Sequence, residues 1–495
     1  MSEATRPAGN TSLARNVLGV PGIVFLVLAA VAPLTGMIVI AAIGIAVGNG
    51  GGMVGAFLLV MAVLLLFAVG YAQMSKILVN AGGFYAFVVK GLGRPMGLVA
   101  GFVAMLGYNC FVAGAIGTSG FFTSMVVKDV FGFDMHWMIW SLISAALVFV
   151  LSRKGIGFSA KILGVCLILE ISILLVLDFT VLFRHGFSFE VFNPSIILSG
   201  SLGLAMLFAA NAFIGFEATA LFSEEAKDPN RTIPRATYIA ITFIGLFAAF
   251  TTWAIVSAIG VAQAQDVALK HLSTGDLVFT ISQDYLGDTL TKVMMVLLLI
   301  SLFAALLALH NSATRYLYAL GRVGVLPRAL GQTRASTGSP QNAAIAQLTF
   351  ATIVAAIYWA AGLDPIAALT ASMTGFGTLG ILVLQLLAAL SIVVYFRRTR
   401  DSRLWKTLIA PGLGGLGLLV IVALAIANFS DMAGSDSPVV GALPWLLPLV
   451  LIAGLAMAAW LKKNKPAVYA NLATDLEQSE TVAESADASA DAPVR

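Results

Sequence analysis

Residues 32–36 read APLTG and residues 213–217 read FIGFE, and each stretch lies well inside a long apolar run. Every backbone N–H and C=O in hydrocarbon needs a partner, so a helix break at this depth is tolerated where it faces protein or a water-filled cavity. Matching breaks in two halves of a chain predict a transport site built from discontinuous helices. Pro and Gly also kink and pack ordinary membrane helices, which is the alternative for either stretch alone.

The composition of the whole chain is that of a membrane protein. Of its 495 residues 59% are hydrophobic and 11% are charged, and the mean hydropathy is +0.97. These values exclude a soluble or a disordered protein and make membrane lipid the expected surroundings. The 28 Lys and Arg residues lie in short clusters, so we expect no nucleic-acid partner. Cys110 and Cys166 lie in apolar runs and are expected to be free thiols, and four histidines offer little for a metal site, so we expect no metal and no cofactor.

Twelve apolar runs are long enough to cross about 30 Å of hydrocarbon. The first is too long for a signal-peptide core and is expected to remain in the mature protein. The runs lie approximately at 17–47, 53–78, 96–127, 136–152, 160–183, 198–222, 236–262, 286–316, 343–362, 366–395, 408–430 and 441–461.

The basic residues predict the orientation of these runs, because Lys and Arg are enriched in cytoplasmic loops. With the N-terminus inside, only four of the 28 Lys and Arg residues lie outside, namely Lys128, Arg184, Lys270 and Lys292. We therefore expect a multi-pass protein of the inner (cytoplasmic) membrane with both termini in the cytoplasm. Residues 1–16 would form an N-terminal tail, and the acidic, Ala- and Ser-rich residues 471–495 a disordered tail.

Few ionisable residues lie within the runs, and such residues usually face a cavity or a partner. Glu170 lies near the middle of the fifth run between apolar neighbours, and it could take up and release a coupling proton. The alternative is a structural carboxyl that is tied to a backbone carbonyl. Glu217 follows the second break, where it could bind a ligand or proton, or fix the unwound backbone by accepting its free N–H groups.

Three other ionisable residues lie near the ends of the runs and are not counted among the candidate site residues. Asp178 lies close to the outer end of the fifth run and is interpreted as interfacial. His310 and Arg315 approach the cytoplasmic end of the eighth run, where Arg315 could extend its side chain to the interface.

Three motifs resemble the amino acid-polyamine-organocation (APC) superfamily. FIGFE at 213–217, SEEAKDP at 223–229 and TIPRA at 232–236 are similar to its sixth-helix and loop signature. NAGGFY at 80–85 with Gly91 agrees, and so do Asn311, Arg315, GRVG at 321–324 and LP at 326–327. The resemblance covers about residues 15–400, and the last two runs carry no motif.

The resemblance implies an all-α integral membrane protein with two five-helix inverted repeats. The repeats would be residues 17–183 and 198–395, with broken helices 1 and 6, followed by two peripheral helices at 408–461. Most members move amino acids, amines or polyamines, coupled to protons or to exchange. We therefore expect a permease that imports an amino acid with a proton. An amine or polyamine permease and an amino acid exchanger are the alternatives within transport.

A substrate site is predicted between the two breaks. Free N–H groups and the positive dipole end after the first break suit a carboxylate, and carbonyls freed at both breaks suit an ammonium. Many members carry a Gly-Ser-Gly-like triplet at the first break, where this chain has Thr35, Gly36 and Met37. Similar exchangers for basic amino acids often have a bulky aromatic residue at the position of Asn211, so the asparagine argues against an arginine antiporter. The expected substrate-binding residues are Thr35, Gly36, Met37, Ala209, Asn211, Phe213 and Gly215, and the proton-coupling residues are Glu170 and Glu217.

A non-transport membrane protein, such as an intramembrane enzyme or a sensor, is the alternative of another class. GTSG at 117–120 fits the pattern of membrane-embedded serine proteases. A nucleophilic serine needs a base within hydrogen-bond reach, and His310 lies in another run at a different depth from Ser119. We therefore expect no enzyme. A channel is disfavoured because broken helices suit alternating access better.

Overall fold

The computed structural model describes residues 17–78, 83–153, 156–272, 274–334, 337–427, 429 and 442–472. Within these ranges the chain is helical apart from loops and one isolated bridge between Leu18 and Ala226. The predicted N-terminal tail at 1–16 lies outside the described residues. So do residues 80–82 of the NAGGFY motif and residues 473–495 of the predicted C-terminal tail.

Long helices alternate with short helical turns along the chain. In order they are α1 Val20–Val31, α2 Pro33–Thr35, η1 Gly36–Ala41, η2 Gly44–Asn49, η3 Gly50–Gly52, α3 Met53–Ile77, α4 Phe84–Leu92, α5 Arg94–Phe131, α6 Trp137–Ser152, α7 Ile156–His185, η4 Phe189–Phe192, α8 Pro194–Ile197, α9 Leu202–Ala212, η5 Phe216–Glu225, α10 Pro229–Ile259, η6 Val261–Gln263, α11 Ala264–Lys270, α12 Leu277–Arg322, η7 Arg328–Gly331, α13 Gln341–Ala360, η8 Pro365–Thr370, α14 Ala371–Arg398, η9 Trp405–Ile409, α15 Ala410–Ala427, η10 Leu443–Trp445 and α18 Leu446–Asn464.

Nine helices in the described ranges are long and apolar enough to cross a membrane. One of them, Val20–Ile77, contains both the first and the second predicted runs. The fourth and fifth predicted runs correspond to α6 and α7, which are not among these nine. The chain is therefore a multi-pass membrane protein, and its twelve-helix count stays a prediction.

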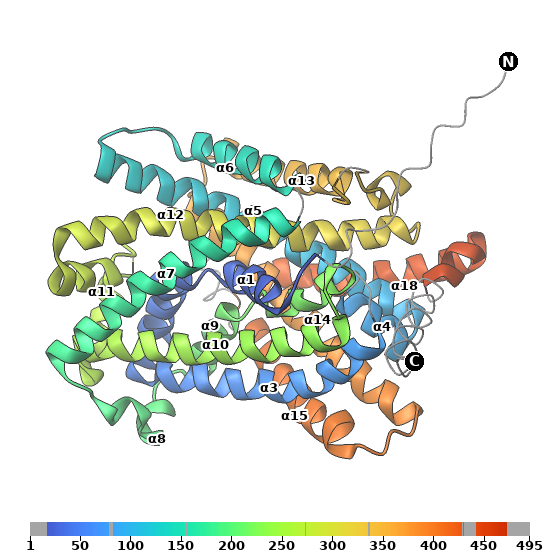
Figure 1. Ribbon diagram of the computed structural model, residues 1–495, viewed down its shortest axis with the longest axis horizontal. Coiled ribbons are helices and arrows are strands. Elements are labelled where there is room, and N and C mark those ends of the chain that lie inside the picture. Colours follow the sequence, from blue (N-terminus) through green and yellow to red (C-terminus); the bar gives the residue numbers. More distant parts are fainter. Residues whose placement is uncertain are drawn as a thin grey trace, which may run out of the picture.

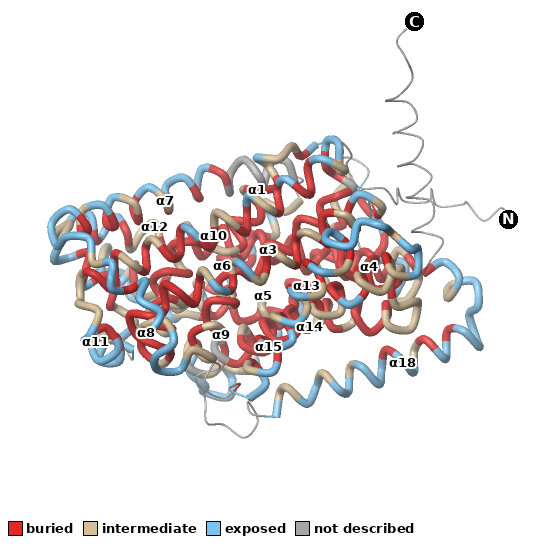
Figure 2. The backbone as a smooth tube through the Cα atoms, turned by 90° about the horizontal axis from the view of Figure 1, so that it is seen from below, coloured by how far each residue is buried: buried red, intermediate tan, exposed pale blue. Residues whose placement is uncertain are grey.

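The long helices lie side by side in one bundle, with α3 against α10 and α5 against both α12 and α14 (Figure 1). Buried residues concentrate at the centre, whereas α18 runs along the outside and is largely exposed (Figure 2). Small residues let the central helices approach closely. A Cβ added to Gly377 on α14 would lie 2.8 Å from the carbonyl oxygen of Gly107 on α5, so glycine is required at this crossing.

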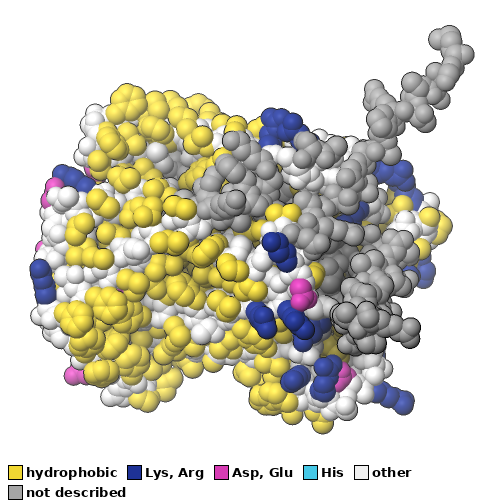
Figure 3. Space-filling view, viewed as in Figure 1, with side chains coloured by type: hydrophobic (Ala, Val, Ile, Leu, Met, Phe, Trp, Pro, Cys, Tyr) yellow, Lys and Arg dark blue, Asp and Glu magenta, His cyan; other side chains and the backbone are white. Residues whose placement is uncertain are grey.

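The surface agrees with a bilayer as the solvent. On the face drawn in Figure 3, hydrophobic side chains cover the middle of the bundle, and most Lys and Arg side chains gather toward the end where α4 and α18 lie. An apolar band with basic residues gathered at one end is typical of a membrane protein that follows the positive-inside rule.

Candidate functional site

The first predicted break is a real interruption of helical geometry. Helix α1 ends at Val31, and Ala32 has a left-handed backbone with φ 49°. Pro33 then begins α2. Proline has no backbone N–H and its ring clashes with the carbonyl four residues earlier, so the helix cannot run through this position unbroken. The chain continues as a wider helical turn, η1, over Gly36–Ala41.

The second break lies between α9 and η5. Helix α9 ends at Ala212, and Gly215 adopts a φ of 123°, which residues with a side chain rarely adopt. Past this point the chain forms a tighter helix over Phe216–Glu225. The glycine in FIGFE is therefore the residue that allows the helix to stop and restart.

The two breaks lie against each other. A Cβ added to Gly215 would lie 3.0 Å from the Ala30 Cβ and 3.6 Å from the Ala30 carbonyl carbon. Ala30 lies in the last turn of α1, two residues before Ala32, so the second break packs against the end of α1 next to the first break.

Glu170 on α7 holds the first break. Its Oε2 accepts a hydrogen bond from the Leu34 N–H at 3.3 Å and one from the Ser301 hydroxyl on α12 at 2.7 Å. Thr35 donates to the same Ser301 oxygen at 3.2 Å. The Glu170 side chain is fully buried, and its Oε1 has no partner among the described residues. The carboxyl therefore accepts from an N–H and a hydroxyl instead of bonding to a backbone carbonyl.

Glu217 holds the second break in a similar way. The Gly215 N–H donates to both of its carboxyl oxygens, at 3.1 and 3.0 Å. Tyr108 on α5 donates to Oε1 at 2.6 Å, and Gln385 on α14 donates to Oε2 at 3.3 Å. This carboxyl thus fixes unwound backbone, as one of the two sequence interpretations describes.

The predicted substrate residues are distributed around the breaks on different sides. Thr35 and Asn211 are half-buried, and Asn211 donates to Thr378 on α14 at 2.6 Å. Gly36 and Met37 instead line a small apolar pocket together with Phe247 on α10. Thr35 and Asn211 therefore belong to the polar side of the breaks, and Gly36 and Met37 to the apolar side.

Two further predicted residues show little exposed surface. Ala209 on α9 is fully buried, and Phe213 is 1% exposed. In this conformation neither side chain is open to a ligand.

Comparison with known proteins decides the family. The amino acid permease family model matches residues 18–455, which is most of the chain. The chain belongs to the amino acid permease family. This match confirms the resemblance to the APC superfamily that the three motifs indicate.

The relatives of this permease are distant. Branched-chain amino acid permease BcaP of Lactococcus lactis subsp. cremoris (strain MG1363) is 27% identical over 314 residues, 58% of this chain and 64% of that protein. Branched-chain amino acid permease BcaP of Bacillus subtilis (strain 168) is 24% identical over 420 residues, 79% of this chain and 84% of that protein. The methylthioribose transporter of B. subtilis (strain 168) is 23% identical over 329 residues, 62% of this chain and 67% of that protein. The permease thus spans less than two thirds of the L. lactis relative in this match.

Family membership indicates a transporter and not an enzyme. In the GTSG sequence, the Ser119 hydroxyl donates to Ser144 on α6 at 3.0 Å, and both serines are buried. This serine makes a helix-packing contact in the permease.

Asp178, which the sequence places near the outer end of the fifth run, is enclosed by protein. Its side chain is fully buried, and Oδ2 accepts a hydrogen bond from Thr251 on α10 at 2.7 Å. The sequence could not reveal this because the partner belongs to another helix. A signal was present in Thr251 and Thr252, two adjacent hydroxyls within the apolar seventh run.

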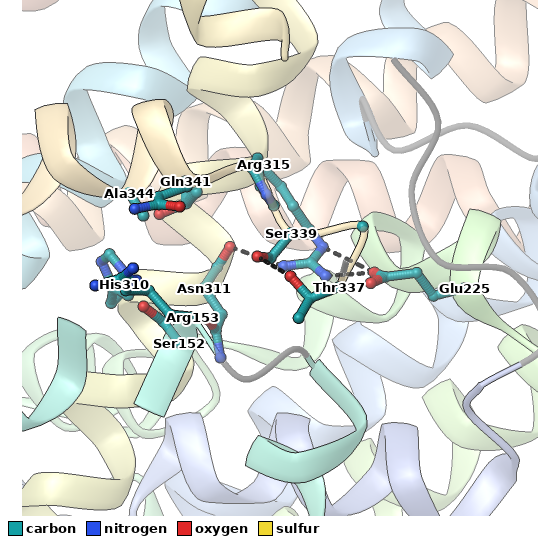
Figure 4. A pocket seen from close by; sticks show the side chains of 13 residues that line it. Ser152, Arg153, Glu225, His310, Asn311, Arg315, Thr337, Ser339, Gln341 and Ala344 are labelled. Carbon is teal, nitrogen blue, oxygen red and sulfur yellow. Dashed lines mark hydrogen bonds and ion pairs between the residues drawn. The ribbon is translucent and has the colours of Figure 1, made fainter. Parts of the chain in front are cut away.

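Arg315 also differs from its sequence interpretation. It does not extend to the interface but is 3% exposed and forms an ion pair with Glu225 at the end of η5. Figure 4 shows this pair beside Thr337 and Ser339. His310, five residues earlier on α12, is fully buried and bonded through Nδ1 to Gln347 on α13 at 2.5 Å.

Proposed function

We propose that this permease is a secondary transporter that imports an amino acid across the cytoplasmic membrane together with a proton. The observation that carries the proposal is the packing of the second break, at Gly215, against Ala30 in the last turn of α1, with a buried carboxyl bonded to the backbone beside each break. Paired discontinuous helices near the middle of the membrane are the usual setting for a transporter site.

The substrate would lie between the breaks. Its carboxylate would bind at Thr35, on the polar side of the first break, where the positive end of a helix dipole favours an anion. The Gly36 N–H donates to the Ala32 carbonyl at 2.8 Å, and Gly36 and Met37 would line the apolar side of the substrate site. Its ammonium would bind backbone carbonyls freed at the two breaks, with Asn211 beside it. Thr35 and Asn211 are half-buried, which supports their role as the polar groups that meet the substrate.

Proton coupling would act through Glu170. The ionised carboxylate is a strong acceptor for the Leu34 N–H and the Ser301 hydroxyl, and protonation weakens it as an acceptor. Protonation would therefore loosen the first break from α7 and α12 and let it rearrange with the substrate. Glu217, which receives donors from Gly215, Tyr108 and Gln385, would chiefly hold the second break.

A neutral amino acid is the proposed substrate class. A dicationic polyamine would need paired carboxylates to compensate the desolvation of two ammonium groups, and Glu217 is already engaged by three donors. Two relatives are named as branched-chain amino acid permeases, and a third, from L. lactis, as a histidine permease. These names support an amino acid as the substrate.

The proposed architecture is twelve membrane helices, ten of them in two inverted five-helix repeats, with both termini in the cytoplasm. The gathering of Lys and Arg toward one end of the bundle supports this orientation (Figure 3). Cysteine accessibility on either side of the membrane would test it loop by loop.

The test of function is uptake by the purified permease in proteoliposomes. The panel contains radiolabelled branched-chain amino acids, histidine, spermidine and methylthioribose, with and without an inward proton gradient. We expect saturable accumulation of one or more amino acids that a protonophore abolishes. Accumulation of spermidine or methylthioribose in the absence of any amino acid uptake would overturn the assignment. Exchange that needs an internal amino acid and no proton gradient would replace import by antiport.

A further inference from the structure

A polar pocket lies away from the two breaks, at the inner end of the bundle in the proposed orientation. It is formed by the end of α6, the C-terminal half of α12 and the segment that leads into α13. Arg153, Asn311, Arg315 and Glu225 contribute polar atoms to its lining (Figure 4). Thr314 lines it as well.

Arg315 and Glu225 form the charged side of this pocket. Their side chains are only 4% and 3% exposed. The Arg315 Nε and Nη2 both donate to one oxygen of Glu225, Nη1 donates to the Asn311 carbonyl at 3.2 Å, and the guanidinium lies 4.6 Å from the Phe222 ring centroid. Because the pair is buried in an environment of low dielectric constant, an anion that enters the pocket would interact strongly with the Arg315 guanidinium.

The same glutamate ties together the inner ends of both broken helices. The N–H groups of Val17 and Leu18, just before α1, donate to the Glu225 carbonyl at 2.9 Å, and the Lys227 N–H donates to the Leu18 carbonyl at 2.7 Å. The Glu225 side chain then joins this bridge to Arg315 on α12. The inner ends of α1 and η5 are thus fastened to α12 through one ion pair.

The pocket also contains buried polar atoms that no group in the described part of the chain satisfies. Asn311 Nδ2 and Thr314 Oγ1 have no hydrogen-bond partner among the described residues, although the residues are only 7% and 3% exposed. Arg153 Nε likewise has no hydrogen-bond partner within the ranges that the structure describes. Unsatisfied buried polar atoms are costly and rare in native proteins. An amide N–H2, a hydroxyl and a guanidinium N–H are all donors, so the missing group is an acceptor.

We propose that this pocket is a carboxylate-binding subsite at the inner mouth of the permease, in which the carboxylate of the transported amino acid competes with Glu225 for Arg315. The proposal rests on the proposed function for its ligand. The carboxylate would accept from Asn311 and Thr314 while it draws the guanidinium away from Glu225. Loss of the ion pair would release the inner ends of α1 and η5 from α12, so arrival of substrate from the inside would open the inner mouth.

The test is transport kinetics measured separately from each side of the membrane. Right-side-out vesicles give the half-saturation concentration at the outer face, and inside-out vesicles give it at the inner face. Thr314→Val removes the unpartnered hydroxyl and keeps the shape of the side chain. We expect it to raise the inner half-saturation concentration about tenfold, the effect of one hydrogen bond to a charged group, and to leave the outer value unchanged.

Ser312→Ala is the matched control, because Ser312 lies on the same helix, is 1% exposed and donates to the Ala308 carbonyl within α12. It should leave both values at wild type. Asn311→Ser is the second variant, which should raise the inner value if Thr314→Val does not reach the membrane. The decarboxylated amine of the substrate, added at the inner face as a competitor, should inhibit wild type and Thr314→Val equally.

Four results are decisive. If the wild type transports and both variants keep its inner half-saturation concentration, the subsite is overturned and the proposed function stands. The same holds if a variant changes the half-saturation concentration equally at both faces. If Thr314→Val weakens inhibition by the amine by the same factor as it raises the inner half-saturation concentration of the amino acid, no carboxylate is recognised in the pocket. Failure of the wild type to transport any amino acid would overturn the proposed function itself.

Discussion

The backbone N–H of Leu34 donates to Glu170 Oε2 at 3.3 Å, although the two residues are 136 positions apart in the chain. This contact joins the unwound part of the first helix to the middle of α7. Its counterpart is the Gly215 N–H, which donates to Glu217 only two residues away. The first break is therefore held by a carboxyl from another helix. The second is held by a carboxyl from the segment that follows it, and Tyr108 on α5 and Gln385 on α14 fix that carboxyl in place.

Glu170→Gln should abolish accumulation driven by a proton gradient and retain amino acid exchange. Glutamine keeps the size and one acceptor oxygen, so the Leu34 N–H can still be satisfied, but it cannot gain or lose a proton. The measurement is uptake with an imposed pH gradient beside counterflow without one. Ser172→Ala on the same helix is the control, because Ser172 is exposed and bonds to the Ile168 carbonyl. Wild-type accumulation with unchanged pH dependence in Glu170→Gln would reduce Glu170 to a structural residue.

Gly215→Ala should abolish transport and lower thermal stability. The backbone at this position has φ 123°, and the new Cβ would lie 3.0 Å from the Ala30 Cβ, so both conformation and space oppose the change. A side chain held in such a region costs on the order of 1–3 kcal/mol. Uptake and the melting temperature in detergent measure the two effects. Gly412→Ala, where nothing lies within 4 Å of the added Cβ, should behave as wild type. Equal activity of the two variants would contradict the role of the second break.

Gly36 should tolerate alanine and not leucine. A Cβ at Gly36 would have its nearest neighbour, the Val31 carbonyl oxygen, at 3.8 Å, which is an ordinary contact. A leucine would extend into the small apolar pocket against Phe247 and displace η1 from α10. We expect Gly36→Ala to transport and Gly36→Leu to be folded and inactive, as judged by uptake and by elution as a single species in size-exclusion chromatography. Wild-type uptake by Gly36→Leu would remove this segment from the substrate site.

Glu225→Ala should lower the free energy of unfolding by about 3–5 kcal/mol, because it leaves the buried guanidinium of Arg315 without its carboxylate. The double variant Glu225→Ala/Arg315→Ala removes both charges and should lose less than the sum of the losses in Glu225→Ala and Arg315→Ala. Denaturant unfolding in detergent gives the values for the four members of the cycle. Additive losses would mean that the two side chains do not stabilise each other.

Spermidine should compete poorly with a transported amino acid. The described carboxyls at the breaks, Glu170 and Glu217, each already accept hydrogen bonds from a backbone N–H and from side chains. Two ammonium charges would have to be desolvated without a free carboxylate. Inhibition of amino acid uptake by increasing spermidine is the measurement, with a neutral amino acid as the positive comparison. Saturable spermidine uptake that displaces every amino acid would reverse this ranking.

The sequence by itself determined the class of protein and the places where two helices break. Apolar runs of membrane-spanning length follow from composition. Pro33 and Gly215 favour a break through their covalent structure, and the matching position of the two stretches in the chain predicted the breaks, whereas Pro234 lies inside α10 without ending it. The FIGFE, SEEAKDP and TIPRA motifs were likewise enough to indicate the family.

Tertiary structure alone decided what each buried polar residue does. Glu170 bonds to Ser301, Asp178 to Thr251 and Arg315 to Glu225, and in each pair the partner comes from another helix. An ionisable side chain in hydrocarbon must find a partner, but the sequence does not show which helix supplies it. That is why the burial of Asp178 and Arg315 within the protein follows only from the packing of the helices. The separation of Thr35 and Asn211 from Gly36 and Met37 has the same origin.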